Sequence, residues 1–132
     1  MMKNKYFKYF QPNKLDLKDE YGDCAVRTIC KAENMEWLEA YDLMWSYSRE
    51  VQSPLNCKHG FEHILKKLGY KYCPISNKNG SKRPTVTGFS KAHTNGTYVL
   101  VVANHYVCSK DGFFYDTFDS GDKSLYGYWE KE

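Results

Sequence analysis

The chain has 132 residues, of which 42% are hydrophobic and 17% aromatic, and its formal net charge is +3. This length fits one domain with its own hydrophobic core, and this composition argues against a disordered chain. Nucleic-acid binding is not expected, because no helix-turn-helix, zinc-finger or RNA-binding sheet motif accompanies the modest charge, and the basic run at 78–83 is typical of a solvated loop.

We expect a single domain over residues 1–132. The hydrophobic pattern indicates that it consists of an N-terminal arm at 1–20, a helical half at 21–69 and a mostly β half at 70–132. In chain order we expect helices at about 24–32, 35–49 and 56–68, a short strand at 70–75, a helical turn at 86–92, and strands at about 96–102, 104–108, 113–118 and 124–129. The last strand should pair with 113–118 through the loop at 119–122. The predicted fold class is α+β, with N-terminal helices packed on a C-terminal antiparallel sheet.

Cys24 lies where a loop gives way to the first predicted helix, in the run Tyr21-Gly22-Asp23-Cys24-Ala25-Val26-Arg27. Unpaired backbone N–H groups at the start of a helix favour negative charge, which lowers the pKa of a thiol placed there. We expect Asp23 to cap this helix and Arg27, four residues later, to pair with Asp23. Because Cys24 precedes the apolar stripe of the helix, the pattern favours a reactive thiol over a buried one.

A second group of polar residues falls on a predicted β-hairpin. Asp111-Gly112 is a strong two-residue turn signal, and it places Lys110 opposite Phe113. In that register His105 and Asp116 are diagonal neighbours on one face, roughly 5.5–8 Å apart, which lets an imidazole and a carboxylate form a hydrogen bond. Such a carboxylate would orient the histidine and stabilise the imidazolium that forms when a thiol loses its proton.

The remaining cysteines and histidines have simpler interpretations. Cys30, Cys57, Cys73 and Cys108 fit inert structural thiols. The spacing of Cys57, His59, His63 and Cys73 matches no common zinc pattern, and the segment is better explained as a surface helix. We therefore expect no metal site and no cofactor.

Four motifs stand out in the chain: Gly22-Asp23-Cys24-Ala25-Val26-Arg27-Thr28-Ile29, Gly96-Thr97-Tyr98-Val99-Leu100, His105-Tyr106-Val107 and Asp111-Gly112-Phe113-Phe114-Tyr115-Asp116-Thr117. Together they resemble the motifs of compact papain-like cysteine peptidases, a group common in bacteria and their phages. The resemblance runs from about residue 21 to 129. It implies a minimal papain-like fold in which the cysteine opens the first core helix and the histidine and acid lie on neighbouring strands. Carried over to this sequence, it makes Cys24, His105 and Asp116 a catalytic triad.

The oxyanion donors are less clearly indicated. Many papain-like enzymes have a glutamine six residues before the cysteine, but Lys18 occupies that position here. The backbone N–H of Cys24 would supply one donor, and Gln11, Asn13 and Asn104 are the candidates for a second.

The expected function is a thiol-dependent hydrolase that cleaves a peptide or isopeptide bond through a thioester intermediate. The expected partner is a protein or peptide substrate. The same triad would serve acyl transfer, including transglutamination, or deamidation. The alternative from a different class of function is that the chain is a non-catalytic papain-like module, which binds and inhibits a host or phage protein. Its twelve tyrosines would suit such a binding surface.

A cytoplasmic protein with reduced thiols is expected, since no signal peptide or transmembrane segment is found and the number of cysteines is odd.

Overall fold

The computed structural model describes residues 4–15, 22–76 and 82–132. In chain order the elements are β1 (Phe7–Tyr9), α1 (Cys24–Glu33), α2 (Trp37–Glu50), α3 (Lys58–Lys67), β2 (Tyr70–Pro74), α4 (Val86–Ala92), β3 (Thr97–Val102), β4 (His105–Lys110), β5 (Phe113–Asp116) and β6 (Gly127–Lys131). The α+β class is confirmed. No helix within these described residues is long and apolar enough to cross a lipid bilayer.

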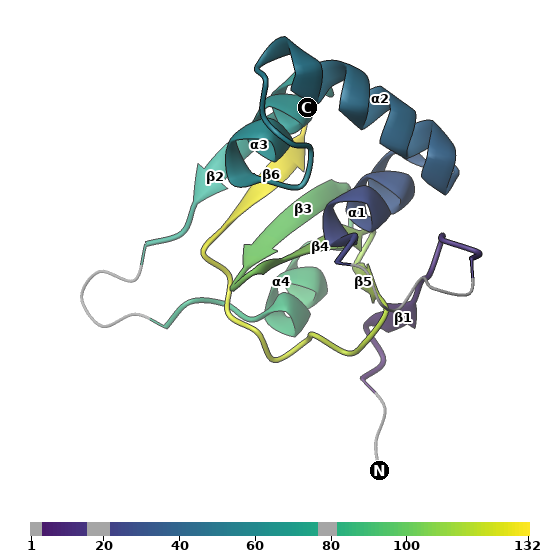
Figure 1. Cartoon of the computed structure of the whole chain (residues 1–132). Helices are drawn as coiled ribbons and strands as arrows, with labels where there is room; N and C mark the ends of the chain where they lie inside the picture. The colour runs from purple at the N-terminus through teal and green to yellow at the C-terminus, as the bar shows by residue number, and fades with distance from the viewer. Residues whose placement is uncertain (1–3, 16–21, 77–81) are drawn as a thin grey trace.

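The strands form one mixed sheet with the order β1-β5-β4-β3-β6-β2. All neighbouring strands are antiparallel except β1 and β5, which are parallel. Helices α1, α2 and α3 cover one face of the sheet, and α4 lies against the other (Figure 1). The predicted packing of the N-terminal helices on the sheet is therefore confirmed.

The central strand β3 has apolar residues at almost every position because both of its faces are covered. Val99 belongs to the core beneath α1, α2 and α3, which also contains Ile29 and Phe61. Leu100, the next residue along, belongs to the second core, with Phe89 of α4. The alternation of β3 residues between two cores fixes the register of the strand, since a shift by one residue would exchange the two sets.

The hairpin of β4 and β5 forms as predicted. Asp111 and Gly112 have φ values of 52° and 90°, which suit a tight turn between twisted antiparallel strands. Lys110 pairs with Phe113 across the ladder. His105 begins β4 and Asp116 ends β5, so both lie at the end of the hairpin opposite the turn.

The predicted partner of the last strand is wrong. Strand β6 pairs with β3 and β2, whereas the free edge of β5 is occupied by β1, from the segment expected to be only an arm. The rings of Phe7 and Phe114 pack 5.5 Å apart, and the N–H of Phe10 donates to the carbonyl of Asp116 at 2.8 Å. Because β1 is parallel to β5, the sheet is mixed and not purely antiparallel.

Gly60, at the third position of α3, is buried where the helix meets the loop before it. A Cβ at Gly60 would lie 2.1 Å from the carbonyl oxygen of Pro54 and 2.8 Å from that of Ser53, both backbone atoms. We expect Gly60→Ala to lower the free energy of unfolding by about 1–3 kcal/mol or more, because the helix must move away from the loop. Urea denaturation measures this change.

Gly88→Ala is the matched control, because Gly88 is also the third residue of a helix, α4. Its added Cβ would be 3.3 Å from the nearest neighbouring atom, the side-chain oxygen of Thr85. Alanine is the better helix former by roughly 0.5–1 kcal/mol, so this variant should remain about as stable as the parent protein. Equal stability of the two variants would contradict the close approach at Gly60.

Candidate active site

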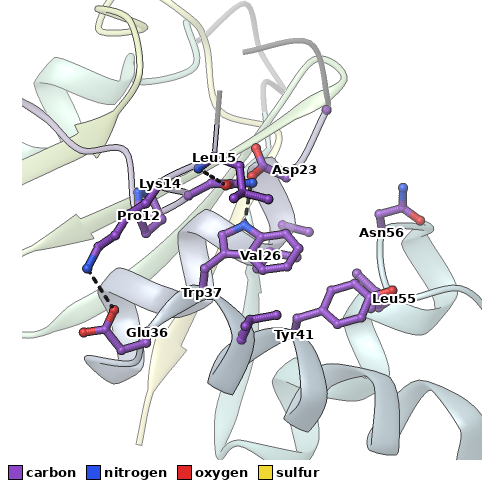
Figure 2. Close-up of a pocket in the computed structure, with 14 residues that line it drawn as sticks. Pro12, Lys14, Leu15, Asp23, Val26, Glu36, Trp37, Tyr41, Leu55 and Asn56 are labelled. Atoms are coloured by element: carbon purple, nitrogen blue, oxygen red, sulfur yellow. Dashed lines mark hydrogen bonds and ion pairs between the residues drawn. The ribbon is translucent and has the colours of Figure 1, made fainter. Parts of the chain in front are cut away.

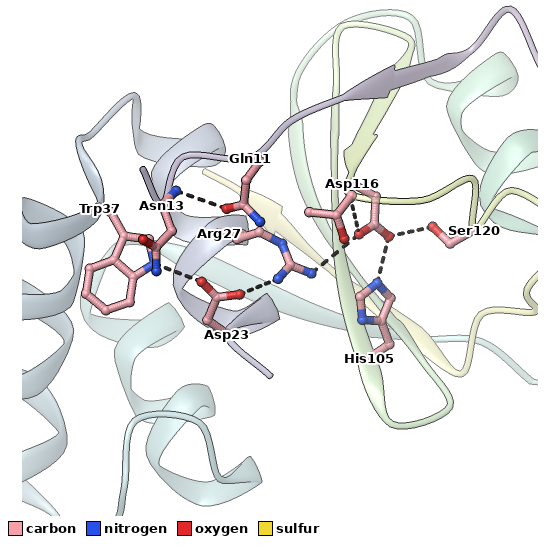
Figure 3. Close-up of polar contacts among 9 residues, drawn as sticks. Gln11, Asn13, Asp23, Arg27, Trp37, His105, Asp116 and Ser120 are labelled. Carbon is pink, nitrogen blue, oxygen red and sulfur yellow. Dashed lines mark hydrogen bonds and ion pairs between the residues drawn. The ribbon is translucent and has the colours of Figure 1, made fainter. Parts of the chain in front are cut away.

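Three elements bring the predicted triad together at one end of the sheet. Cys24 is the first residue of α1, which packs on β4, and His105 and Asp116 lie at the adjoining ends of β4 and β5. Figure 3 shows His105 and Asp116 side by side, with the start of α1 next to them. The structure thus gathers residues that are scattered along the sequence.

His105 and Asp116 form a direct hydrogen bond. The distance between His105 Nε2 and Asp116 Oδ2 is 2.6 Å, and the two side chains are only 12% and 2% exposed. Burial lowers the pKa of His105, but hydrogen bonds with Asp116 and Cys24 and the charges of both groups outweigh it and raise the pKa to about 9. Since Nε2 is bonded to the carboxylate, Nδ1 is the nitrogen left for the thiol.

Burial raises the pKa of the Cys24 thiol, but four other influences lower it and together outweigh burial. In order of size they are the hydrogen bond with His105, a backbone hydrogen bond at Tyr106, the charge of His105 and the charge of Arg27. The net shift of the Cys24 pKa is downward. By contrast, burial raises the pKa of Cys30 and of Cys108 to about 12. Cys24 is therefore the cysteine whose surroundings favour the thiolate.

Asp116 is held by several donors besides the histidine. The hydroxyl of Ser120 donates to Oδ2 at 2.7 Å, the N–H of Thr117 donates to Oδ1 at 2.8 Å, and Arg27 Nη2 lies 3.5 Å from Oδ1 (Figure 3). These contacts fix the carboxylate while leaving it bonded to His105. Ser120 is not predicted from the sequence, where it gives no signal beyond its place in a predicted loop.

Asp23 does not cap α1, contrary to expectation. Its side chain makes no capping hydrogen bond, and instead it pairs with Arg27 and accepts a hydrogen bond of 2.9 Å from Trp37 Nε1. The guanidinium is the stronger partner for a buried carboxylate, because it supplies charge as well as donors. The predicted ion pair of Asp23 and Arg27 is confirmed.

Arg27 joins the start of α1 to the acid of the hairpin. Its guanidinium contacts Asp23 on one side and Asp116 on the other, and all three residues are buried. Contacts therefore run from Asp23, which precedes Cys24, through Arg27 and Asp116 to His105 (Figure 3).

Cys24 and His105 line a hollow of about 750 Å³, which we call the Cys24 pocket. Its wall also includes Asn104, Tyr72, Tyr126 and Trp129. The aromatic walls come from β2, β6 and the loop before β6, none of which the sequence linked to the site.

Of the candidate oxyanion side chains, the structure brings Asn104 to the Cys24 pocket. Asn104 has a φ of 54°, in the tight turn between β3 and β4, directly before His105. Gln11 and Asn13 are not on this wall: the side-chain oxygen of Gln11 accepts from the N–H of Asn13 at 2.9 Å, and that of Asn13 accepts from the N–H of Leu15 at 3.0 Å. Both amides thus help to shape the segment after β1.

The Cys57, His59, His63 and Cys73 group is dispersed over α3 and β2. Cys57 precedes α3 and is exposed, Cys73 lies on β2, and His63 pairs with Glu50 at 2.8 Å. Among the residues at 4–15, 22–76 and 82–132, no three His, Cys, Asp or Glu side chains are grouped as ligands of a metal ion.

Comparison of the chain with protein-family models, with curated proteins and with solved structures finds no match in any of the three. Function is therefore inferred from the geometry of the site itself.

Replacing Asp116 by asparagine should lower the pKa of His105. The carboxylate is the strongest influence that raises this pKa, and without its charge the burial of the ring is opposed mainly by Cys24. The imidazolium, whose pKa of about 9 keeps it protonated at neutral pH in the parent protein, should then lose its proton at a clearly lower pH. An NMR titration of the histidine ring resonances measures the shift.

Asp119→Asn is the control for this titration, because Asp119 lies in the loop just after Asp116 and accepts from the N–H of Gly121 rather than from the imidazole. It should leave the His105 pKa in place. A value that stays at about 9 in Asp116→Asn would show that the carboxylate does not set the protonation of His105.

Proposed function

We propose that this protein is a thiol-dependent hydrolase of the papain-like type, which cleaves an amide bond of a peptide or protein. The observation that carries the proposal is the chain of hydrogen bonds from Cys24 to His105 to Asp116, with the thiol pKa lowered and the imidazole pKa raised. Opposite shifts of this kind favour a thiolate beside an imidazolium, which is the reactive form of a cysteine nucleophile.

The proposed reaction has two stages. The Cys24 thiolate attacks the carbonyl carbon, and His105 gives its proton to the leaving amine as the carbon–nitrogen bond breaks and a thioester forms. Water then attacks the thioester while His105 takes its proton, and the acid product leaves as Cys24 is restored. Asp116 holds the imidazole throughout. The Cys24 N–H and the Asn104 side chain are the proposed donors to the developing oxyanion.

The same intermediate would support acyl transfer if an amine replaced water, and deamidation if the substrate were a glutamine side chain. A protein that only binds and inhibits a host or phage protein would use the tyrosine-rich surface around the site without needing the thiol.

We place the activity in the cytoplasm, because all five cysteines are free thiols.

Alkylation by iodoacetamide separates catalysis from simple binding. Between pH 6 and 7 we expect Cys24 to be labelled faster than Cys57, which is exposed and serves as an internal reference, because alkylation proceeds through the thiolate. Cys30 and Cys108 should label slowest, since burial raises their pKa to about 12. Peptide mapping by mass spectrometry gives the rate at each cysteine.

His105→Ala is the companion variant for this experiment. It should slow labelling at Cys24, whose pKa the imidazole lowers, and leave the rate at Cys57 unchanged. Similar rates at Cys24 and Cys57 in the parent protein would count against a hydrolase and favour the binding module.

A further inference from the structure

A second hollow lies on the α2 side of the first turn of α1 (Figure 2). It encloses about 580 Å³, within the range of small-ligand sites, and we call it the Trp37 pocket after a residue of its wall. Gly22, Ala25 and Asn56 line both pockets. The two hollows therefore share part of their walls close to Cys24.

The wall of the Trp37 pocket is apolar over most of its surface, and it is built from Leu15, Val26, Trp37, Leu38, Tyr41 and Leu55. Leu15 and Leu38 are 72% and 68% exposed, so large apolar side chains face water at this hollow. Clustered apolar exposure beside a reactive group is typical of a ligand-binding surface, whereas single exposed leucines are ordinary.

The charged residues of this wall already have partners. Lys14 and Glu36 lie 3.9 Å apart at the rim, and Asp23 pairs with Arg27 and Trp37 (Figure 2). A charged ligand would have to compete with these contacts, whereas an apolar group gains by leaving water.

The apolar surface is also held in place. The indole of Trp37 stacks on Tyr41 with ring centroids 5.1 Å apart and an angle of 10° between the planes. Its Nε1 donates to Asp23, the residue next to the nucleophile. A ring fixed at both its face and its edge presents a preformed surface, which lowers the entropy cost of binding.

We propose that the Trp37 pocket receives a bulky apolar side chain, aromatic or long aliphatic, of a peptide substrate whose neighbouring amide bond is attacked by Cys24. This inference rests on the proposed function and adds the substrate class. It follows from the residues that the two pockets share, the apolar wall, and a volume that leaves room for a large side chain.

The test compares two reagents that alkylate cysteine, iodoacetamide and N-benzyl iodoacetamide. In both, the Cys24 sulfur displaces iodide and forms a carbon–sulfur bond, so only the benzyl group differs. We expect Cys24 to react about tenfold faster with the benzyl reagent than with iodoacetamide, after division by the same ratio at Cys57, because burial of an aromatic group favours the bound state.

Leu38→Gln makes the wall of the pocket more polar without adding charge. It should reduce the benzyl preference, which is the ratio of the two rates at Cys24, at least threefold. Phe113→Gln is the matched control, since Phe113 is also partly exposed but lies at the turn end of the hairpin, away from His105. Because Leu38 is exposed, the variant should fold, and its thermal midpoint verifies this.

The outcomes separate the two proposals. A Cys24 that reacts faster than Cys57 with iodoacetamide but shows no benzyl preference, or a preference that Leu38→Gln does not reduce, would overturn the substrate class and leave the hydrolase proposal standing. A Cys24 that reacts no faster than Cys57 with either reagent would overturn both.

Discussion

Cys24→Ala is expected to abolish the burst of p-nitrophenolate that the parent protein releases from p-nitrophenyl acetate. This activated ester acylates a reactive thiol without requiring the natural substrate, so it reports the nucleophile directly. In the parent protein one acetyl group should appear on Cys24 by mass spectrometry. In the variant the rate of acylation should fall by about 10³-fold or more, since the site then has no thiol to attack the ester.

Two further variants show whether the effect belongs to the site. His105→Ala should reduce acylation by about 10²–10⁴-fold, as expected for loss of the acid–base group, while Cys24 is still present. Cys57→Ala removes an exposed thiol that does not line the Cys24 pocket and should leave the burst intact. A burst that survives in Cys24→Ala would mean that the acetylated residue lies elsewhere, and the proposed mechanism would be wrong.

Arg27→Gln is expected to cause a large loss of stability. Asp23 and Asp116 are 7% and 3% exposed, and Arg27 contacts both. Removing one partner of a buried ion pair typically costs about 3–5 kcal/mol, because the remaining charge is left in a poorly solvated place. In this protein one cation serves two carboxylates, and total stabilities are only about 5–15 kcal/mol. Urea denaturation at neutral pH measures the loss.

Arg27→Lys retains the charge and should lose less stability than Arg27→Gln, although an ammonium cannot reproduce the planar guanidinium that contacts both acids. The charge of Arg27 also lowers the pKa of Cys24, so the lysine variant should keep a more acidic thiol than the glutamine variant. This second readout, taken from the pH dependence of iodoacetamide labelling, distinguishes an electrostatic role from simple packing. A thiol pKa that falls in Arg27→Gln would contradict it.

Local patterns in the sequence predicted the parts of the site that depend on local structure. The helix beginning at Cys24 follows from the periodicity of its apolar residues, and the Asp111-Gly112 turn sets the register that brings His105 to Asp116. A hairpin turn sets the register of the whole ladder. Recognising the Asp111-Gly112 turn was therefore enough to predict that His105 and Asp116, which are eleven positions apart in the sequence, are neighbours.

The features that the sequence did not predict depend on contacts between distant segments. Strand β1 has three residues, too few for a period to emerge, and it forms because β5 offers a free edge and Phe114 a surface for Phe7. The contact of Ser120 with Asp116 and the walls of both pockets likewise arise only when separate elements meet. The error over β6 has the same origin, because pattern alone does not choose between two open edges of a sheet.

The order of the elements along the chain also has a consequence for synthesis. Because α1 precedes β4 and β5, a ribosome releases the thiol well before the imidazole and the carboxylate that we propose to activate it. Until the hairpin has emerged and its outer edge has joined the first strand, a growing chain holds an ordinary cysteine. Under the proposed function, the reactive form of Cys24 would therefore arise only after the hairpin has been made.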